Sequence, residues 1–97
     1  MDYAVKKVVK ALHRRGFAVA PSEVYKAAWE AFEKGVGAVR AVDRRSGWLA
    51  VFYLHLEFSG DRGVLTLHAR KDCSDPPLVK ASFTVKRPAH ADNTLFP

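Results

Sequence analysis

Apolar side chains recur every three or four residues in the first third of this 97-residue chain and every second residue after it. The first pattern predicts a helix over residues 2–15, with Asp2 as its N-cap and Gly16 in a left-handed conformation at its end. Its apolar stripe consists of Val5, Val8, Val9 and Leu12. Lysine, histidine and arginine side chains fill the opposite side, so this helix is amphipathic and strongly basic.

A second helix is predicted over residues 22–34, after an apolar connector at residues 17–21 and with Ser22 as its N-cap. This helix carries two adjacent apolar rows, one of Tyr25, Trp29 and Phe32 and one of Val24, Ala28 and Ala31. Two adjacent rows make a wide apolar face, so we expect this helix to be the central one. Trp29 and Trp48 both lie on apolar faces and are interpreted as core residues.

The two-residue period after residue 36 is typical of strands. Strands are predicted at residues 36–42, 48–58, 64–71 and 78–87, of which the first has the weakest signal and the second the strongest. Short turns join them, so we expect an antiparallel meander with both helices on one face. The predicted fold is therefore α+β, a two-layer sandwich of two N-terminal helices on a three- to four-stranded antiparallel sheet. It forms one domain over residues 1–88, followed by a flexible tail at residues 89–97.

Residues 36–45 leave one alternative open. If residues 38–45 formed a third helix and the segment from Trp48 formed a wing, the chain would be a winged-helix DNA-binding protein. The candidate recognition helix would be short and flanked by Gly37 and Gly47, and three long strands are more than a wing needs. The sheet is therefore the preferred interpretation.

The register of the two central strands follows from keeping apolar side chains on one face. Pairing Gly60 with Gly63 places His55 opposite His68 and Tyr53 opposite Arg70. The outer face of the sheet should then display Tyr53, His55, Thr66, His68, Arg70, Lys80, Ser82, Thr84 and Lys86.

Positive charge is concentrated near the N-terminus. The chain has 16 Lys and Arg against 10 Asp and Glu, a net charge of +6, and residues 1–20 carry +4 of it. Arg40, Arg44 and Arg45 form a second cluster at the first predicted turn. Such clusters can be merely solvated, but a basic helix beside an arginine-rich turn is also suited to binding phosphates.

We therefore expect a non-enzymatic module that binds nucleic acid, with RNA or single-stranded DNA favoured over duplex DNA. The predicted contact residues are Lys6, Lys7, Lys10, Arg14, Arg40, Arg44, Arg45, Tyr53, His55, His68, Arg70, Lys80 and Lys86.

Two other functions stay open. Leu49, Val51 and Val64 make one end of the outer sheet face apolar, which suits an assembly subunit that forms a homodimer. The pair of His55 and His68 could instead serve as acid and base in metal-free RNA cleavage, or hold a metal together with Glu57. Two half-exposed histidines that happen to face each other are the more common case.

Several classes of site are not expected. A single cysteine, Cys73, excludes an intrachain disulfide and a cysteine-rich zinc site, and no base lies near it in the sequence to make it a nucleophile. No phosphate-binding glycine motif or metalloprotease motif occurs, so we expect no cofactor and no metal.

The longest apolar run is too short to span a membrane, and Met1–Tyr3 does not begin a signal peptide, so we expect a cytoplasmic protein. The scarcity of Gln and Asn fits either a thermophile or GC-rich coding.

Overall fold

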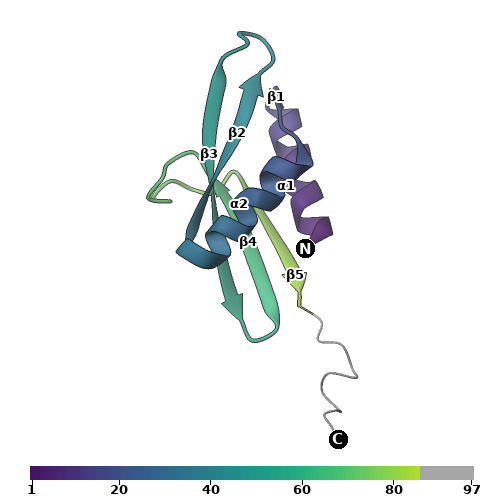
Figure 1. Ribbon diagram of the computed structural model, residues 1–97, viewed down its shortest axis with the longest axis vertical. Coiled ribbons are helices and arrows are strands. Elements are labelled where there is room, and N and C mark those ends of the chain that lie inside the picture. Colours follow the sequence, from purple (N-terminus) through teal and green to yellow (C-terminus); the bar gives the residue numbers. More distant parts are fainter. Residues whose placement is uncertain (86–97) are drawn as a thin grey trace, which may run out of the picture.

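Two helices pack on a five-stranded antiparallel sheet in the computed structural model, which describes residues 1–85 (Figure 1). The elements are α1 (Asp2–Arg14), β1 (Phe17–Ala18), α2 (Pro21–Lys34), β2 (Val36–Asp43), β3 (Leu49–Ser59), β4 (Arg62–His68) and β5 (Val79–Thr84). The strands follow one another across the sheet in chain order. The predicted α+β class and antiparallel meander are confirmed. The predicted number of strands was wrong, because Phe17–Ala18 pairs with Val42–Asp43 and is a strand, not a connector.

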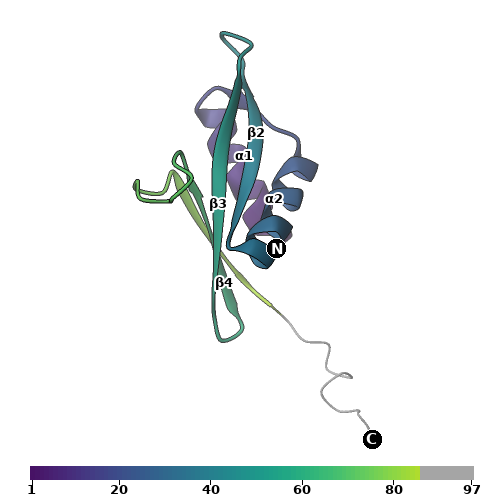
Figure 2. The ribbon, with the colours of Figure 1, turned by 60° about the vertical axis from the view of Figure 1, so that its left-hand side comes forward.

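The sheet is strongly curled, and the helices cover only its middle. α2 lies over β2 and β3, whereas α1 packs against β5 and α2. The β2–β3 turn extends past the helices at one end of the sheet, and the β3–β4 turn extends past them at the other (Figures 1 and 2). Both ends of the sheet therefore offer surfaces that no helix covers.

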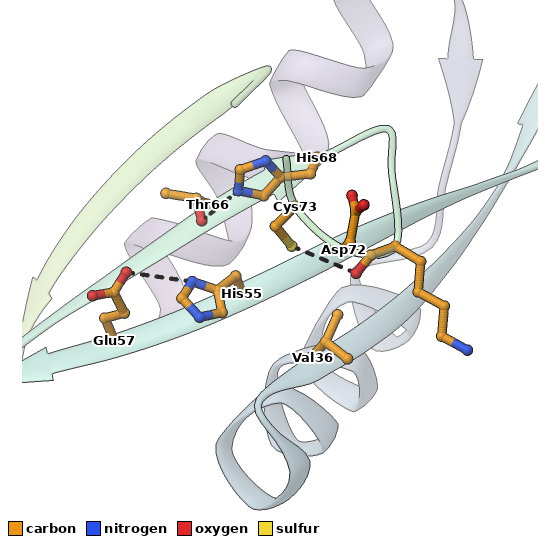
Figure 3. A pocket seen from close by; sticks show the side chains of 8 residues that line it. Val36, His55, Glu57, Thr66, His68, Asp72 and Cys73 are labelled. Carbon is orange, nitrogen blue, oxygen red and sulfur yellow. Dashed lines mark hydrogen bonds and ion pairs between the residues drawn. The ribbon is translucent and has the colours of Figure 1, made fainter. Parts of the chain in front are cut away.

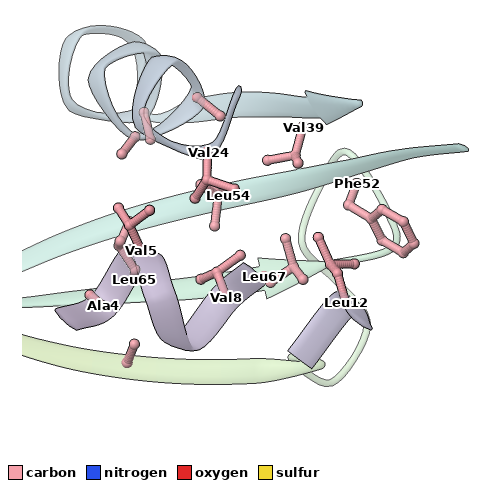
Figure 4. Packing of buried hydrophobic residues seen from close by; sticks show 14 of the residues in the cluster. Ala4, Val5, Val8, Leu12, Val24, Val39, Phe52, Leu54, Leu65 and Leu67 are labelled. Atoms are coloured by element: carbon pink, nitrogen blue, oxygen red, sulfur yellow. The ribbon is translucent and has the colours of Figure 1, made fainter. Parts of the chain in front are cut away.

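The core lies between the helices and the concave face of the sheet (Figure 4). Side chains from all three parts are fully buried there, among them Val5, Val8 and Leu12 of α1, Val24 of α2, and Val39, Leu54, Leu65 and Leu67 of the sheet. The side of α2 against the sheet is otherwise made of small residues, Ala27, Ala28 and Ala31. These alanines let α2 approach the strands closely, and the larger side chains of its second row are left at the margin.

Both tryptophans were wrongly assigned to the core. Trp29 is 61% exposed and Trp48 is 77% exposed. Trp29 lies outside the buried side of α2, and Trp48 directly precedes β3, beside the β2–β3 turn. The wide apolar face of α2 is therefore only half covered.

A close contact between α2 and β2 fixes the spacing of the two layers. A Cβ atom on Gly37 would lie 1.9 Å from the carbonyl oxygen of Ala27, so only glycine fits at this position. On the same strand, the N–H of Ala38 donates to Glu30 (3.0 Å) and the N–H of Arg40 donates to Glu23 (3.4 Å). Two carboxylates of α2 thus cover the edge of β2 that β1 leaves unpaired.

Both predicted N-caps were wrong, although the predicted helices are present. The N-cap positions are Met1 and Ala20, neither of which makes a side-chain cap. Pro21 occupies the first turn of α2, where its missing N–H does no harm, and this moves the start of the helix ahead of Ser22. Asp2 instead accepts a hydrogen bond from the Tyr25 hydroxyl and ties α1 to α2. The pKa of Tyr25 is raised, first because the hydrogen bond to Asp2 holds the phenol proton and second because burial disfavours the phenolate.

Residues 36–43 form a strand, so the winged-helix alternative was wrong. The predicted tail at residues 89–97 and the predicted contact residue Lys86 lie outside the described residues. Neither of the helices in residues 1–85 has the length and apolar character needed to cross a membrane.

We predict that Gly37→Ala lowers the free energy of unfolding by about 3 kcal/mol, because the added methyl group has to push α2 off the sheet. Urea denaturation followed by circular dichroism measures the change. The matched control is Ala38→Val on the neighbouring exposed position, which adds volume to β2 without this contact and should change stability by less than about 0.5 kcal/mol. Equal stability of the two variants would contradict the packing described here.

Candidate nucleic-acid interface

Two adjoining hollows gather the cations of α1 and of the β2–β3 turn. The first hollow lies between α1 and β5 and is lined by Tyr3, Lys6, Lys7, Lys10, Arg14 and Val79. The second lies at the C-terminal end of α1 and is lined by His13, Arg14, Arg15, Gly16, Asp43, Arg44 and Arg45. Arg14 lines both hollows, so together they form one continuous surface. We call its seven charged side chains the cationic track: Lys6, Lys7, Lys10, Arg14, Arg15, Arg44 and Arg45.

Helical spacing places the first part of the track on one flank of α1. Tyr3, Lys7, Lys10 and Arg14 follow one another at intervals of three or four residues, so their side chains lie one above the other. This flank faces away from the buried stripe of α1 and borders β5 at Val79. The amphipathic pattern of the helix is therefore what directs the lysines into the first hollow.

A backbone hydrogen bond brings the second part of the track to the end of α1. Gly16 ends the helix with φ at +87°, a left-handed conformation that glycine adopts without strain. Its carbonyl oxygen then accepts a hydrogen bond from the N–H of Arg44 (2.9 Å). This contact sets Arg14 and Arg15 beside Arg44 and Arg45, which are separated from them by about thirty residues of sequence.

The track is electrostatically uncompensated within residues 1–85. No ion pair in this part of the chain involves any of its seven side chains. The guanidinium of Arg15 donates to the carbonyl oxygens of Ala11 (3.3 Å) and Leu78 (3.2 Å). The one acid that lines either hollow is Asp43, whose carboxylate accepts a hydrogen bond from the backbone N–H of Arg45 (3.0 Å) and so holds the turn.

The described strands carry on their outer face the side chains that sequence alternation assigned to them, but with a different register. Arg70 was wrongly assigned to this face, because β4 ends at His68 and Arg70 lies in the loop that follows. The strands β3 and β4 turn at Gly60–Asp61, with Ser59 opposite Arg62, and not at Asp61–Arg62. This shift of two residues keeps every side chain on its predicted face and changes every partner. His55 lies opposite Thr66, and His68 lies opposite Tyr53, so the predicted cross-strand pair of His55 and His68 was wrong.

The side chain of His68 is buried under the loop that follows β4. Its Nδ1 is 3.1 Å from the carbonyl oxygen of Asp75, and its Nε2 is 2.9 Å from the hydroxyl of Thr66. Figure 3 shows this ring turned toward Thr66, while His55 on the next strand is turned toward Glu57. Because both nitrogens of His68 are engaged, its geometry suits anchoring the loop and does not suit proton transfer to a substrate.

Two basic side chains on this side of the molecule lie near acids. Nδ1 of His55 is 3.4 Å from Glu57, and Nε of Arg70 is 3.9 Å from Asp72. Arg40 and Lys80 are exposed on this face, and Tyr53 is half-buried. The predicted contact residues are thus divided between the cationic track and the outer face, on different sides of the molecule.

The loop at residues 69–78 carries Cys73 and is organised by Asp75. Burial, and then the charges of Asp75 and Asp72, raise the pKa of the Cys73 thiol above its ordinary value, which disfavours the nucleophilic thiolate. No group of three or more His, Cys, Asp or Glu side chains in the described part of the chain could hold a metal ion. The carboxylate of Asp75 accepts hydrogen bonds from the N–H groups of Ala69 (2.9 Å) and Arg70 (3.3 Å), so it organises the loop.

Arg15 belongs to the track but was not among the predicted contact residues. It directly follows Arg14 in the sequence, which was a signal, but its position after the end of the helix depends on Gly16 and on the contact with Leu78.

Comparisons with protein-family models, with curated proteins and with solved structures find no match to this chain.

Asp75 should make the loop sensitive to acid. Burial alone would raise its pKa, but the hydrogen bonds from Ala69 and Arg70 and the nearby His68 lower it below the ordinary value of 3.8. Because the pKa of Asp75 is lower in the folded state than in the unfolded state, its carboxylate stabilises the fold at pH values above the unfolded-state pKa. This stabilisation is lost as the pH falls through the folded-state pKa. We predict that Asp75→Ala is less stable than the wild type at about pH 5 and that the difference narrows toward about pH 2.

Urea denaturation of both proteins at the two pH values measures this difference. Asp61→Asn on the exposed β3–β4 turn is the matched control, and it should leave stability close to that of the wild type at both pH values. A difference for Asp75→Ala that stays constant or widens in acid would contradict the role assigned to this carboxylate.

Proposed function

We propose that this protein is a non-enzymatic module that binds RNA or single-stranded DNA along the cationic track. The observation that carries the proposal is that seven cationic side chains from two distant segments line one continuous hollow surface without an acid paired to any of them. Like charges gathered in this way repel one another, and a polyanion removes the repulsion. The phosphate backbone of a nucleic acid is such a polyanion, and lysine and arginine side chains commonly bind its phosphate groups.

The dimensions of the track suit several consecutive phosphates of one strand. Lys6 and Arg14 are eight residues apart on α1, about 12 Å along the helix axis. Arg44 and Arg45 continue the track beyond the end of the helix. The lysines would act as point charges, and the planar guanidinium groups would bind phosphate oxygens in pairs.

A hollow favours a single strand over a duplex. The lysines lie in the depression between α1 and β5, which a flexible strand can enter. Reading duplex DNA instead requires a helix or a two-stranded ribbon that protrudes into a groove. The projecting β2–β3 hairpin is the element that could do so, and duplex binding that depends on Arg44 and Arg45 but not on the lysines would support that alternative.

Exposed aliphatic side chains support a second candidate function, homodimer formation. Val42, Leu49 and Val51 lie together on the outer side of the β2–β3 hairpin, and all three are exposed. Val64, which was expected to join them, is half-buried on β4. This small apolar surface is on the opposite side of the sheet from α1 but adjoins the β2–β3 turn, so an interface there would leave the lysines of the track open and lie close to Arg44 and Arg45.

The track predicts a steep dependence of binding on salt. Binding of a fluorescent oligothymidylate or oligouridylate of about 20 nucleotides, measured by anisotropy between about 50 and 200 mM salt, should give a log–log slope of roughly −3.5 to −5, which corresponds to about five to seven phosphate contacts on a single strand. The double change of Arg44→Ala and Arg45→Ala should make the slope shallower by about 1.4, because two phosphate contacts are lost.

The control for this experiment is Lys26→Ala, which removes a solvent-exposed charge of α2 that lines neither hollow. It should leave the slope within the error of the wild type. Weak binding without salt dependence would contradict phosphate binding by the track. If Lys26→Ala changed the slope as much per removed charge as the Arg44 and Arg45 double change, net charge and not the track would govern the interaction.

The homodimer candidate predicts that the protein sediments as a dimer at micromolar concentration. Val51→Asp would place a charge in the apolar surface and should give a folded monomer, whereas Lys26→Ala should stay dimeric. A monomeric wild type in analytical ultracentrifugation would remove this candidate.

A further inference from the structure

Four aromatic rings form a partly exposed row on the helix side of the sheet. Trp29 and Phe32 come from α2, Phe58 from β3 and Phe83 from β5. The centroids of consecutive rings are 5.9, 5.8 and 6.1 Å apart, and each pair is arranged edge to face. We call these four side chains the aromatic row.

Of the two rings on the strands, Phe58 is exposed and Phe83 is half-buried, at the end of the sheet where the β3–β4 turn extends past the helices (Figure 1). Phe58 and Phe83 point to the same side of the sheet as the core residues Leu56 and Ala81, but they lie nearer the β3–β4 turn. Phe32 is 57% exposed and Phe58 is 45% exposed. Together with Trp29, these side chains leave a large aromatic surface without cover from any described residue.

Phe83 is held in place by the neighbouring strand. Its ring lies directly over Gly63, where an added Cβ would come within 2.4 Å of the ring. Gly63 is paired with Phe83 across β4 and β5, so the missing side chain makes the space that the ring fills. The row therefore combines two side chains of α2 with two of the sheet, and a glycine of β4 makes the space for the Phe83 ring.

The aromatic row begins where the cationic track ends. Val79 lines the lysine hollow, and Phe83 lies four residues further along the same side of β5, about 13 Å away at the usual rise of a strand. Tyr3, which is exposed, lines the same hollow at the first turn of α1, and this end of the helix lies beside β5 in Figure 1. Phosphate-binding side chains and aromatic rings therefore follow one another over the surface.

From this arrangement we infer that the aromatic row is a stacking platform for the unpaired bases of a single strand whose phosphates follow the cationic track. This inference rests on the proposed function and adds the selection of single strands. Bases in a duplex are stacked on one another and do not present their faces, whereas the bases of a single strand can stack on protein rings. Stacking accepts every base, so the platform would bind many sequences.

The direct experiment compares two probes of equal length and phosphate number, an oligothymidylate and an abasic oligomer of about 20 units. Wild-type protein should bind the oligothymidylate more tightly than the abasic oligomer at the same salt concentration. Trp29→Ala and Phe32→Ala should each weaken oligothymidylate binding by roughly 5- to 100-fold, in line with the loss of one stacked base. Both variants should bind the abasic oligomer as the wild type does and keep its salt dependence.

Leu49→Ala is the matched control, because it truncates an exposed apolar side chain on the other side of the sheet. It should leave the binding of both probes unchanged. As a direct readout, the fluorescence of Trp29 in a Trp48→Phe background should be quenched by the oligothymidylate and not by the abasic oligomer.

The outcomes separate this inference from the proposed function. If wild-type protein binds neither probe, the proposed function fails and the platform with it. If both probes bind with the same affinity, and Trp29→Ala binds like the wild type, the track is supported and the platform is overturned. The platform is also overturned if Trp29→Ala turns a dimer into a monomer while oligothymidylate binding is unchanged, because the row is then a protein interface.

Discussion

The contact between the C-terminal end of α1 and the β2–β3 turn determines the charge distribution of this protein. The hydrogen bond from the N–H of Arg44 to the carbonyl oxygen of Gly16 sets two pairs of arginines beside each other. No described acid pairs with these arginines, so their repulsion opposes the contact. Burial of the apolar stripe of α1 between β5 and α2 holds the helix in place against that repulsion.

The two sides of the sheet use polar residues in different ways. On the outer side, histidine and arginine side chains lie near carboxylates, and His68 is enclosed by the loop that Asp75 organises. On the helix side, the lysines and arginines of the track lie in the two hollows, and aromatic rings occupy the uncovered end of the sheet. The close contacts of His55, His68 and Arg70 with acids thus lie on the outer side, whereas the track and the aromatic rings lie on the helix side.

The sequence predicts the elements of this fold well because its two hydrophobic periods are clear and change once. It also predicts which strand residues face outward. Side chains alternate between the two faces with a period of two residues, so a register error of two residues leaves each side chain on the same face. The error itself arose at the β3–β4 turn, where two glycines allow two different two-residue loops and only the three-dimensional structure chooses between them. The lysines of α1 were predicted from their own helix, whereas the role of Arg15 required a contact between distant segments.

The aromatic row shows why apolar periodicity alone did not locate that surface. Trp29 and Phe32 have the spacing of core residues on α2, and Phe58 and Phe83 have the spacing of core residues on their strands. Whether such residues are buried depends on the length of the covering helices relative to the sheet, and this length difference is a tertiary property. The small side of α2, rich in alanine, was the residue-level signal that its other row would be left outside.

Mapping by nuclear magnetic resonance tests the central claim most directly, because it does not assume which residues bind. Backbone amide shifts recorded during titration with a short oligouridylate or oligothymidylate should change along the exposed flank of α1 and at Gly16 and residues 43–47. The amides of Tyr53, His55 and Thr66 on the outer side should stay at their positions. Shifts confined to the outer side of the sheet, or none at saturating oligonucleotide, would contradict the account of the cationic track as the binding surface.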